Sequence, residues 1–180
     1  LTASDGAAND NFGFSVAISG STIVVGALDI GDFLARGAAY VFNRQGGDWV
    51  ETQKLIPSDA ATGDFFGFSV GVSGSTVIVG ARNDTINGNI LQGSVYVFNR
   101  QGGRWVETQK LTASDGVAVN QFGWSVAVSG STIVVGAIGD EIGGNINQGS
   151  VYVFNRQGGS WVETQQLTAS DGGANDNFGF

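Results

Sequence analysis

Apolar residues along the chain alternate with small or polar ones in short runs, and these runs return at a regular interval. The stretch 12–27, FGFSVAISGSTIVVGA, has close copies beginning at Phe66 and Phe122, and a fourth copy begins at Phe178. The starting positions are therefore 54, 56 and 56 residues apart. Self-similarity at a fixed period predicts a repeat protein in which each unit is one supersecondary building block.

The first half of each unit predicts a hairpin. Residues 12–17 alternate apolar and small side chains, as a strand of period two does. A Ser-Gly-Ser connection follows, in which Gly20 can adopt a positive φ without strain. Residues 22–25, TIVV, are β-branched or apolar without polar alternation, which is typical of a strand buried on both faces.

The second half of each unit predicts two further strands. Residues 38–43, AAYVFN, place Tyr40 and Phe42 two positions apart and therefore on one face. A glycine turn leads into residues 49–55, WVETQKL, whose alternate positions are polar. This polar alternation predicts that the fourth strand is the outermost and most exposed one.

Four short antiparallel strands per unit, with apolar residues on both faces, predict a blade of a β-propeller. We expect an all-β fold, a single propeller segment over residues 1–180. Its three full repeats span residues 1–55, 56–111 and 112–167, and 168–180 start a fourth. A parallel β-helix is the alternative, but its rungs are usually shorter and lack four hairpin-type turns. The 30 glycines and the β-branched runs oppose helices.

The two ends of the chain are nearly identical, since the last fourteen residues almost duplicate the first fourteen, and no methionine is present. We therefore interpret the sequence as a window from a longer tandem array. Propellers close with roughly four to eight blades, so three units alone would leave apolar faces and strand edges open. The partners predicted from this are further copies of the same repeat, in one chain or in a homo-oligomeric ring.

Composition excludes several classes of function. The net charge is −8 and the eight Lys and Arg residues are scattered, so nucleic acid is not an expected partner. Apolar runs are far shorter than the ~20 residues that span a bilayer, so no membrane insertion is expected. The absence of Cys and His removes thiol chemistry and the commonest general base. No acid pair recurs in a strand-anchored position, so we expect no catalytic residues and no enzymatic activity.

The combination Phe66-Gly67, Gly80-Ala81 and Tyr96-Val97-Phe98 resembles the FG-GAP repeat of integrin α-subunit propellers and of many bacterial secreted proteins. The bacterial subtype is the more similar one, and the resemblance covers essentially the whole chain. It implies a secreted or cell-surface, non-enzymatic module for structure or adhesion. Calcium-binding members place an Asp-rich loop between the first two strands, where this chain has Ser-Gly-Ser. No cofactor or metal is therefore expected.

The variable loops between the second and third strands supply the candidate contact residues. They project from one rim and vary while the strands do not, which is typical of a ligand-contacting face. Their spacing fails the EF-hand pattern, and solvated loop tips are the alternative interpretation. The candidates are Asp29, Asp32, Asp84, Asn87, Asn89, Asp140, Glu141, Asn145 and Asn147.

Repeated aromatic residues offer a second candidate surface. Trp49, Trp105 and Trp161 recur in register with a tyrosine in each unit. They could form sugar-stacking platforms, which would make the protein a carbohydrate-binding propeller lectin with sites between blades. Because fixed positions in every copy are what a repeated interface needs, we expect packing of blade against blade instead. Cell-surface proteins and glycans are the two classes of external partner that these interpretations allow.

Overall fold

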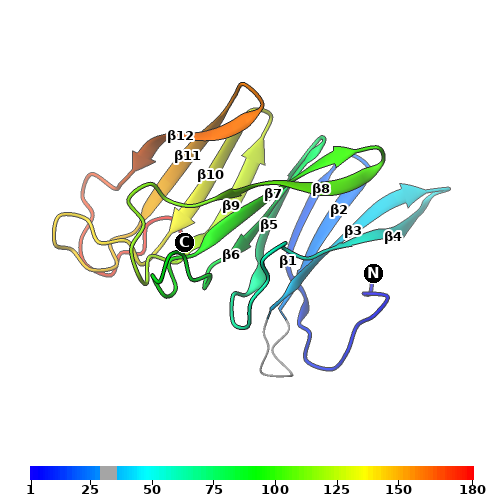
Figure 1. Cartoon of the computed structure of the whole chain (residues 1–180), viewed down its shortest axis with the longest axis horizontal. Helices are drawn as coiled ribbons and strands as arrows, with labels where there is room; N and C mark the ends of the chain where they lie inside the picture. The colour runs from blue at the N-terminus through cyan, green and yellow to red at the C-terminus, as the bar shows by residue number, and fades with distance from the viewer. Residues whose placement is uncertain (29–35) are drawn as a thin grey trace.

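The computed structural model describes residues 1–28 and 36–180. These residues contain twelve strands in three four-stranded antiparallel sheets, one for each repeat, and the sheets stand side by side in a row (Figure 1). The strands are β1 Phe12–Ser19, β2 Thr22–Ala27, β3 Ala38–Gln45, β4 Asp48–Leu55, β5 Phe66–Ser73, β6 Thr76–Ala81, β7 Ser94–Gln101, β8 Arg104–Leu111, β9 Phe122–Ser129, β10 Thr132–Ala137, β11 Ser150–Gln157 and β12 Ser160–Leu167.

Each sheet is a meander in which sequential strands are neighbours, in the order β1-β2-β3-β4 in the first blade and its equivalents in the others. The predicted four-stranded antiparallel units are therefore confirmed, with the polar fourth strand at the sheet edge. Gly20 has a φ of 56° in the turn between β1 and β2, and Gly74 and Gly130 have 55° at the equivalent turns. The Ser-Gly-Ser connection thus needs the positive φ that glycine adopts most readily.

The glycines of the Phe-Gly and Gly-Ala motifs let neighbouring sheets approach closely. A Cβ atom added to Gly26 would collide with the carbonyl oxygen of Gly67, and one added to Gly80 would collide with that of Gly123. The Phe-Gly glycines of the second and third blades therefore lie against the Gly-Ala glycines of the preceding blades. The repeated motif marks the points where backbone meets backbone between blades.

Two apolar faces pack together between the first and second blades. We call the side of a blade that points to the preceding blade its front face, and the opposite side its back face. Buried residues of the two faces form one cluster, which contains Val24, Ala39, Val41 and Leu55 of the first back face and Phe66, Val70, Val72, Val77, Val79, Tyr96, Phe98 and Trp105 of the second front face. The core of the molecule is thus built between sheets.

The same arrangement recurs between the second and third blades. Their cluster contains Ile78, Val95, Val97 and Leu111 of the second back face and Phe122, Ile133, Val135, Tyr152, Phe154 and Trp161 of the third front face. Along the inner strands the rings of Phe14, Phe68, Trp124 and Phe180 lie in sequence, with centroids 4.9, 4.9 and 5.5 Å apart. Trp124 therefore fills the place that phenylalanine fills in the other blades.

The three blades form an open row in which no sheet is closed within the described residues. Residues 168–180 were expected to begin a further repeat, but they form turns without a strand. The first strand of each complete blade is held by the second, and residues 168–180 meet no such partner among the described residues. No helix in the described part of the chain is long and apolar enough to cross a membrane.

Candidate functional site

Asp84, a predicted contact residue, points into the second blade. Its carboxylate is buried, Ser94 Oγ donates to Oδ2 at 2.5 Å, and the hydroxyl oxygen of Tyr96 lies 3.1 Å from the same atom. Lys110 Nζ lies 2.6 Å from the same oxygen. Oδ2 of this carboxylate is therefore held by the strands β7 and β8 of its own blade.

Asp140 occupies the same place in the third blade. Ser150 Oγ and Tyr152 OH donate to its Oδ2 at 2.5 and 2.9 Å, and Gln166 Nε2 donates at 2.9 Å. Asn120 Nδ2 donates to Oδ1 at 2.5 Å. Both buried carboxylates thus anchor the variable loop to the sheet.

Asparagines of the variable loops hold the loops in shape. Asn89 Nδ2 donates to Gln92 Oε1 at 2.9 Å, and Asn145 Nδ2 makes the same bond to Gln148 Oε1. Asn147 Nδ2 donates to Asn175 Oδ1 at 3.3 Å. These bonds join each loop to itself or to the following linker.

The remaining candidates do not converge on one site. Asn87 and Glu141 are exposed, each on the loop of a different blade. Asp29 and Asp32 lie outside the described residues. Within residues 1–28 and 36–180 there is no group of three or more acidic, Cys or His side chains arranged to hold a metal ion.

A polar cluster that reaches from linker to sheet was missed by sequence reasoning. Tyr96 OH donates to Asp59 Oδ1 at 2.6 Å, and Lys110 Nζ lies 2.6 Å from Asp59 Oδ2. Burial acts to raise the pKa of Asp59, but hydrogen bonds from Lys110 and Tyr96 outweigh it and hold that pKa below its usual value. Burial and the hydrogen bond to Asp59 raise the pKa of Tyr96.

The sequence did contain a signal for this cluster, because the same three residue types recur at equivalent positions of another unit. The first blade carries Asp5, Tyr40 and Lys54 at the same positions, where Tyr40 OH donates to Asp5 Oδ1 at 2.8 Å and Lys54 Nζ lies 2.7 Å from Asp5 Oδ2. Asp64, further along the linker of the second blade, makes a local bond, because the Ala61 N–H donates to Asp64 Oδ2 at 2.8 Å.

Asp64 adds a second buried carboxyl beside Asp84. Burial raises the pKa of Asp64, the Ala61 N–H acts in the opposite direction, and the negative charge of Asp84 raises the pKa further. In the third blade the equivalent residue is Asn120, which donates to Asp140. The second blade therefore places two acids where the third has an acid and an amide.

The tryptophans lie between blades or at an open end. Trp105 and Trp161 are each only 4% exposed and belong to the two interblade clusters. Trp49 is half-buried and belongs to the cluster on the front face of the first blade. Blade packing therefore accounts for the repeated tryptophans of the second and third blades.

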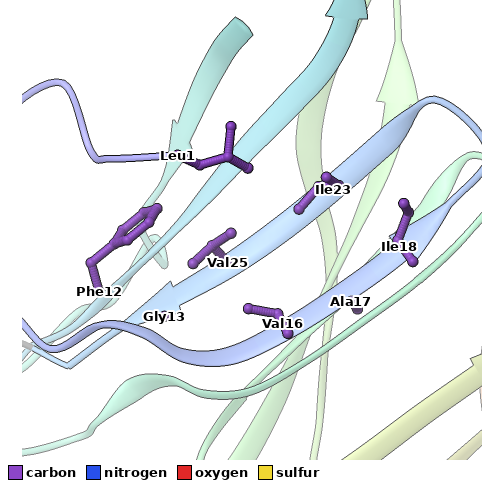
Figure 2. A pocket seen from close by; sticks show the side chains of 8 residues that line it. All are labelled: Leu1, Phe12, Gly13, Val16, Ala17, Ile18, Ile23 and Val25. Atoms are coloured by element: carbon purple, nitrogen blue, oxygen red, sulfur yellow. The ribbon is translucent and has the colours of Figure 1, made fainter. Parts of the chain in front are cut away.

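The front face of the first blade is an open apolar groove of about 480 Å³, shown in Figure 2. Val16 and Ile18 in this groove are 67% and 64% exposed, whereas the equivalent Val70 and Val72 are 6% and 8% exposed. The residues that line the groove are Leu1, Phe12, Gly13, Val16, Ala17, Ile18, Ile23 and Val25. The groove is thus a front face without a neighbouring blade among the described residues.

The back face of the third blade is the matching open surface. Val134, Val151 and Val153 are partly exposed there, whereas Val24, Ile78, Val95 and Val97 at equivalent positions are buried or nearly so. The C-terminal Phe178, Gly179 and Phe180 cover its inner edge and border a shallow groove. The molecule therefore ends in two complementary faces of the type that pack together inside it.

Comparison with known proteins identifies the repeat. No curated protein matches the chain. A family model described as the FG-GAP repeat matches three segments, residues 1–42, 49–98 and 105–154. Each match covers most of a unit, including the Phe-Gly and Gly-Ala positions at which the blades meet. The chain belongs to the FG-GAP repeat family.

Proposed function

We propose that this chain is a non-enzymatic extracellular module for structure and adhesion, whose blades stack with further copies of the same repeat to build a β-propeller. The contrast between Val16 and Val70 is the observation that carries the proposal. Both are valines at the same register of a first strand, yet one is 67% exposed and the other 6%. An apolar face that is exposed on the first blade and buried on the second is typical of a surface that another blade covers.

The apolar character of the open faces supports stacking on copies of the same repeat rather than on other partners. The front-face groove is lined by apolar side chains, and the back face by valines and by Leu167. The observed interfaces between blades join these same two types of surface. A further repeat unit is therefore the partner whose shape and polarity both faces already fit.

Sedimentation velocity over a range of protein concentrations tests the proposal. Replacing both Val16 and Ile18 with glutamate places two charges on the open front face, and we expect association to be lost. Val106→Glu is the matched control, because Val106 is 41% exposed on the outer strand of the middle blade. Association that is the same in the double variant and in the control would refute stacking through this face.

The proposal assigns adhesive contact to the rim formed by the variable loops. It also assigns the protein to the cell surface or to the secreted proteins. Support comes from the exposed side chains of Asn87 and Glu141 on loops that vary while the strands repeat. Surface labelling of intact cells with a membrane-impermeant reagent, compared with labelling of lysed cells, tests the location. Labelling only after lysis would contradict it.

A lectin role between blades receives less support. Stacking on a sugar requires an accessible ring, and Trp105 and Trp161 are buried in the interblade clusters. Titration with simple sugars and a glycan array distinguishes the two roles. Saturable binding that disappears in Trp49→Ala, the half-buried tryptophan of the open face, would favour the lectin.

A further inference from the structure

A side-chain amide joins neighbouring blades at their outer edge. Gln53 Nε2 on β4 donates to the carbonyl oxygen of Trp105 at 2.7 Å, and the Trp105 N–H donates to Gln53 Oε1 at 2.8 Å. Gln109 and Trp161 repeat this pair of bonds with the same distances between the second and third blades. We call this pair of bonds the glutamine latch.

The latch requires a primary amide. Its NH₂ group and its oxygen together match the C=O and N–H of one backbone residue, as a neighbouring strand would. A carboxylate could only accept and an ammonium could only donate, so neither could replace both bonds. Because the bonds go to backbone atoms, the latch fixes the register of one outer strand against the next, whatever side chains surround it.

Each end of the molecule carries half of another latch. Gln165 is the equivalent residue on β12, where its backbone pairs with Val153 of β11, and its exposed side chain makes no hydrogen bond within the described residues. Trp49 is the equivalent of the two latched tryptophans, and it is half-buried where they are 4% exposed. The donor amide and the receiving backbone therefore lie on opposite open faces of the same chain.

We propose that the side chain of Gln165 binds the backbone of Trp49 in a second copy, which makes the association head-to-tail. This inference rests on the proposed function, because the latch forms only if the open faces stack. It adds the residues that set the register and direction of that stacking. A front face meets a back face, and two front faces do not pair.

The inner edge of the third blade shows how the second copy fits. Phe178 N–H donates to Gln148 O at 2.8 Å, as Phe122 N–H donates to Gln92 O at 2.9 Å. The Ser125 hydroxyl donates to Gly179 O at 2.7 Å. The C-terminal segment thus occupies the place that the Phe-Gly segment of a following blade takes.

Replacement of this C-terminal segment by the N-terminal segment of a second copy changes few contacts. Residues 1–14 and 167–180 differ only by Ala7 in place of Gly173. The first fourteen residues of another copy can therefore make the same backbone bonds to the third blade, and they continue into a complete blade. The gain over the resident segment is the buried front face and the latch.

Sedimentation equilibrium of the whole chain with Gln165→Ala measures the latch. Loss of two hydrogen bonds is expected to raise the dissociation constant of self-association about tenfold or more. Gln157→Ala is the control, because Gln157 is an exposed glutamine at the end of β11 in the same blade. We expect it to leave the dissociation constant unchanged, and equal constants for the two variants would overturn the latch.

The same experiment separates failure of the latch from failure of stacking. If Val16→Glu with Ile18→Glu prevents association while Gln165→Ala does not weaken it, stacking holds and the latch is refuted. If the unchanged chain stays monomeric at every concentration, both are refuted.

Direction is tested by cross-linking, since the chain has no cysteine of its own. Chains with Trp49→Cys are mixed with chains with Gln165→Cys and treated with a short bis-maleimide. We expect covalent dimers in the mixture and none from either variant alone. Dimers formed by the Trp49→Cys chains alone would show front face against front face and overturn the proposal.

Discussion

Lys110 holds its ammonium nitrogen 2.6 Å from Oδ2 of the buried Asp84. In the third blade Gln166 brings an amide nitrogen to the equivalent oxygen of Asp140 at 2.9 Å. A second difference accompanies this one, because Asp64 of the second blade is Asn120 in the third. The second blade therefore has one more acid and one more base, and the two blades reach the same local charge with different residues.

Lys110→Gln alone is expected to destabilise the protein by about 2 kcal/mol, because it leaves Asp64 and Asp84 buried without their cation. Adding Asp64→Asn should recover most of that loss, since the double variant reproduces the third blade. Urea unfolding monitored by circular dichroism measures both values. Lys54→Gln is the control, because its partner Asp5 is half exposed and the loss should be about 0.5 kcal/mol. Additive effects of the two substitutions would contradict the coupling.

Asp64→Asn alone is expected to stabilise the protein at neutral pH. The groups that act on Asp64 are Asp84, Asp59, Lys110 and the Ala61 N–H, and burial raises its pKa above the usual 3.8. A carboxyl with a raised folded-state pKa opposes folding once it ionises, and this cost is absent at pH below 3.8. An amide at this position avoids the cost and can donate to Asp84, as Asn120 donates to Asp140.

The gain from Asp64→Asn should therefore shrink as the pH falls toward 3.8. Asp59 acts in the opposite direction, both in the unchanged chain and in the Asp64→Asn variant. Its pKa is lowered on folding, so its contribution to stability is lost as the pH falls below 3.8. Comparison of the two proteins at each pH cancels that shared loss. Unfolding free energies at pH 7, 5 and 4 provide the measurement, and a gain that grows in acid would contradict the assignment.

Gly67→Ala is expected to cost about 3 kcal/mol or more. Gly67 has a φ of 90°, and an added Cβ would collide with the carbonyl oxygen of Ala38 in the neighbouring blade. Gly103→Ala is a matched control, because Gly103 has a φ of 86° and open space around the same position. We expect the control to show only the cost of backbone strain, about 1 kcal/mol. Thermal and urea unfolding of both variants isolate the contact between blades.

Trp105→Ala is expected to lower the free energy of unfolding by about 3–5 kcal/mol, because a large buried ring leaves a cavity between two blades. Trp49→Ala should cost less, since its ring lies on an open face. Urea unfolding of both variants tests the difference. Equal losses would show that Trp49 is as buried in solution as Trp105, which is the result expected if the chain is already associated at the concentration used.

Local pattern was sufficient for the strands and their order. Residues 22–25 were predicted as a strand buried on both faces, and they form part of β2, between β1 and β3. The polar alternation of residues 49–55 correctly placed β4 at the edge. These predictions succeed because alternation of side chains and glycine turns are properties of a few consecutive residues.

The variable loops show where that reasoning stops. Asp84 and Asp140 were candidate contact residues because their loops vary while the strands repeat. Their partners Tyr96 and Lys110 lie 12 and 26 residues further along the chain, and Tyr152 and Gln166 repeat the spacing. Only the return of β7 and β8 beside the loop brings these groups together.

The sequence by itself determined the repeat and its four strands, because both follow from short-range periodicity. The tertiary structure decided which copies of a residue are buried. Val16 and Val70 occupy equivalent positions in closely similar segments, as do Gln109 and Gln165, and another blade covers only Val70 and Gln109. Burial between stacked sheets belongs to the pair of surfaces that meet, so no stretch of sequence specifies it alone.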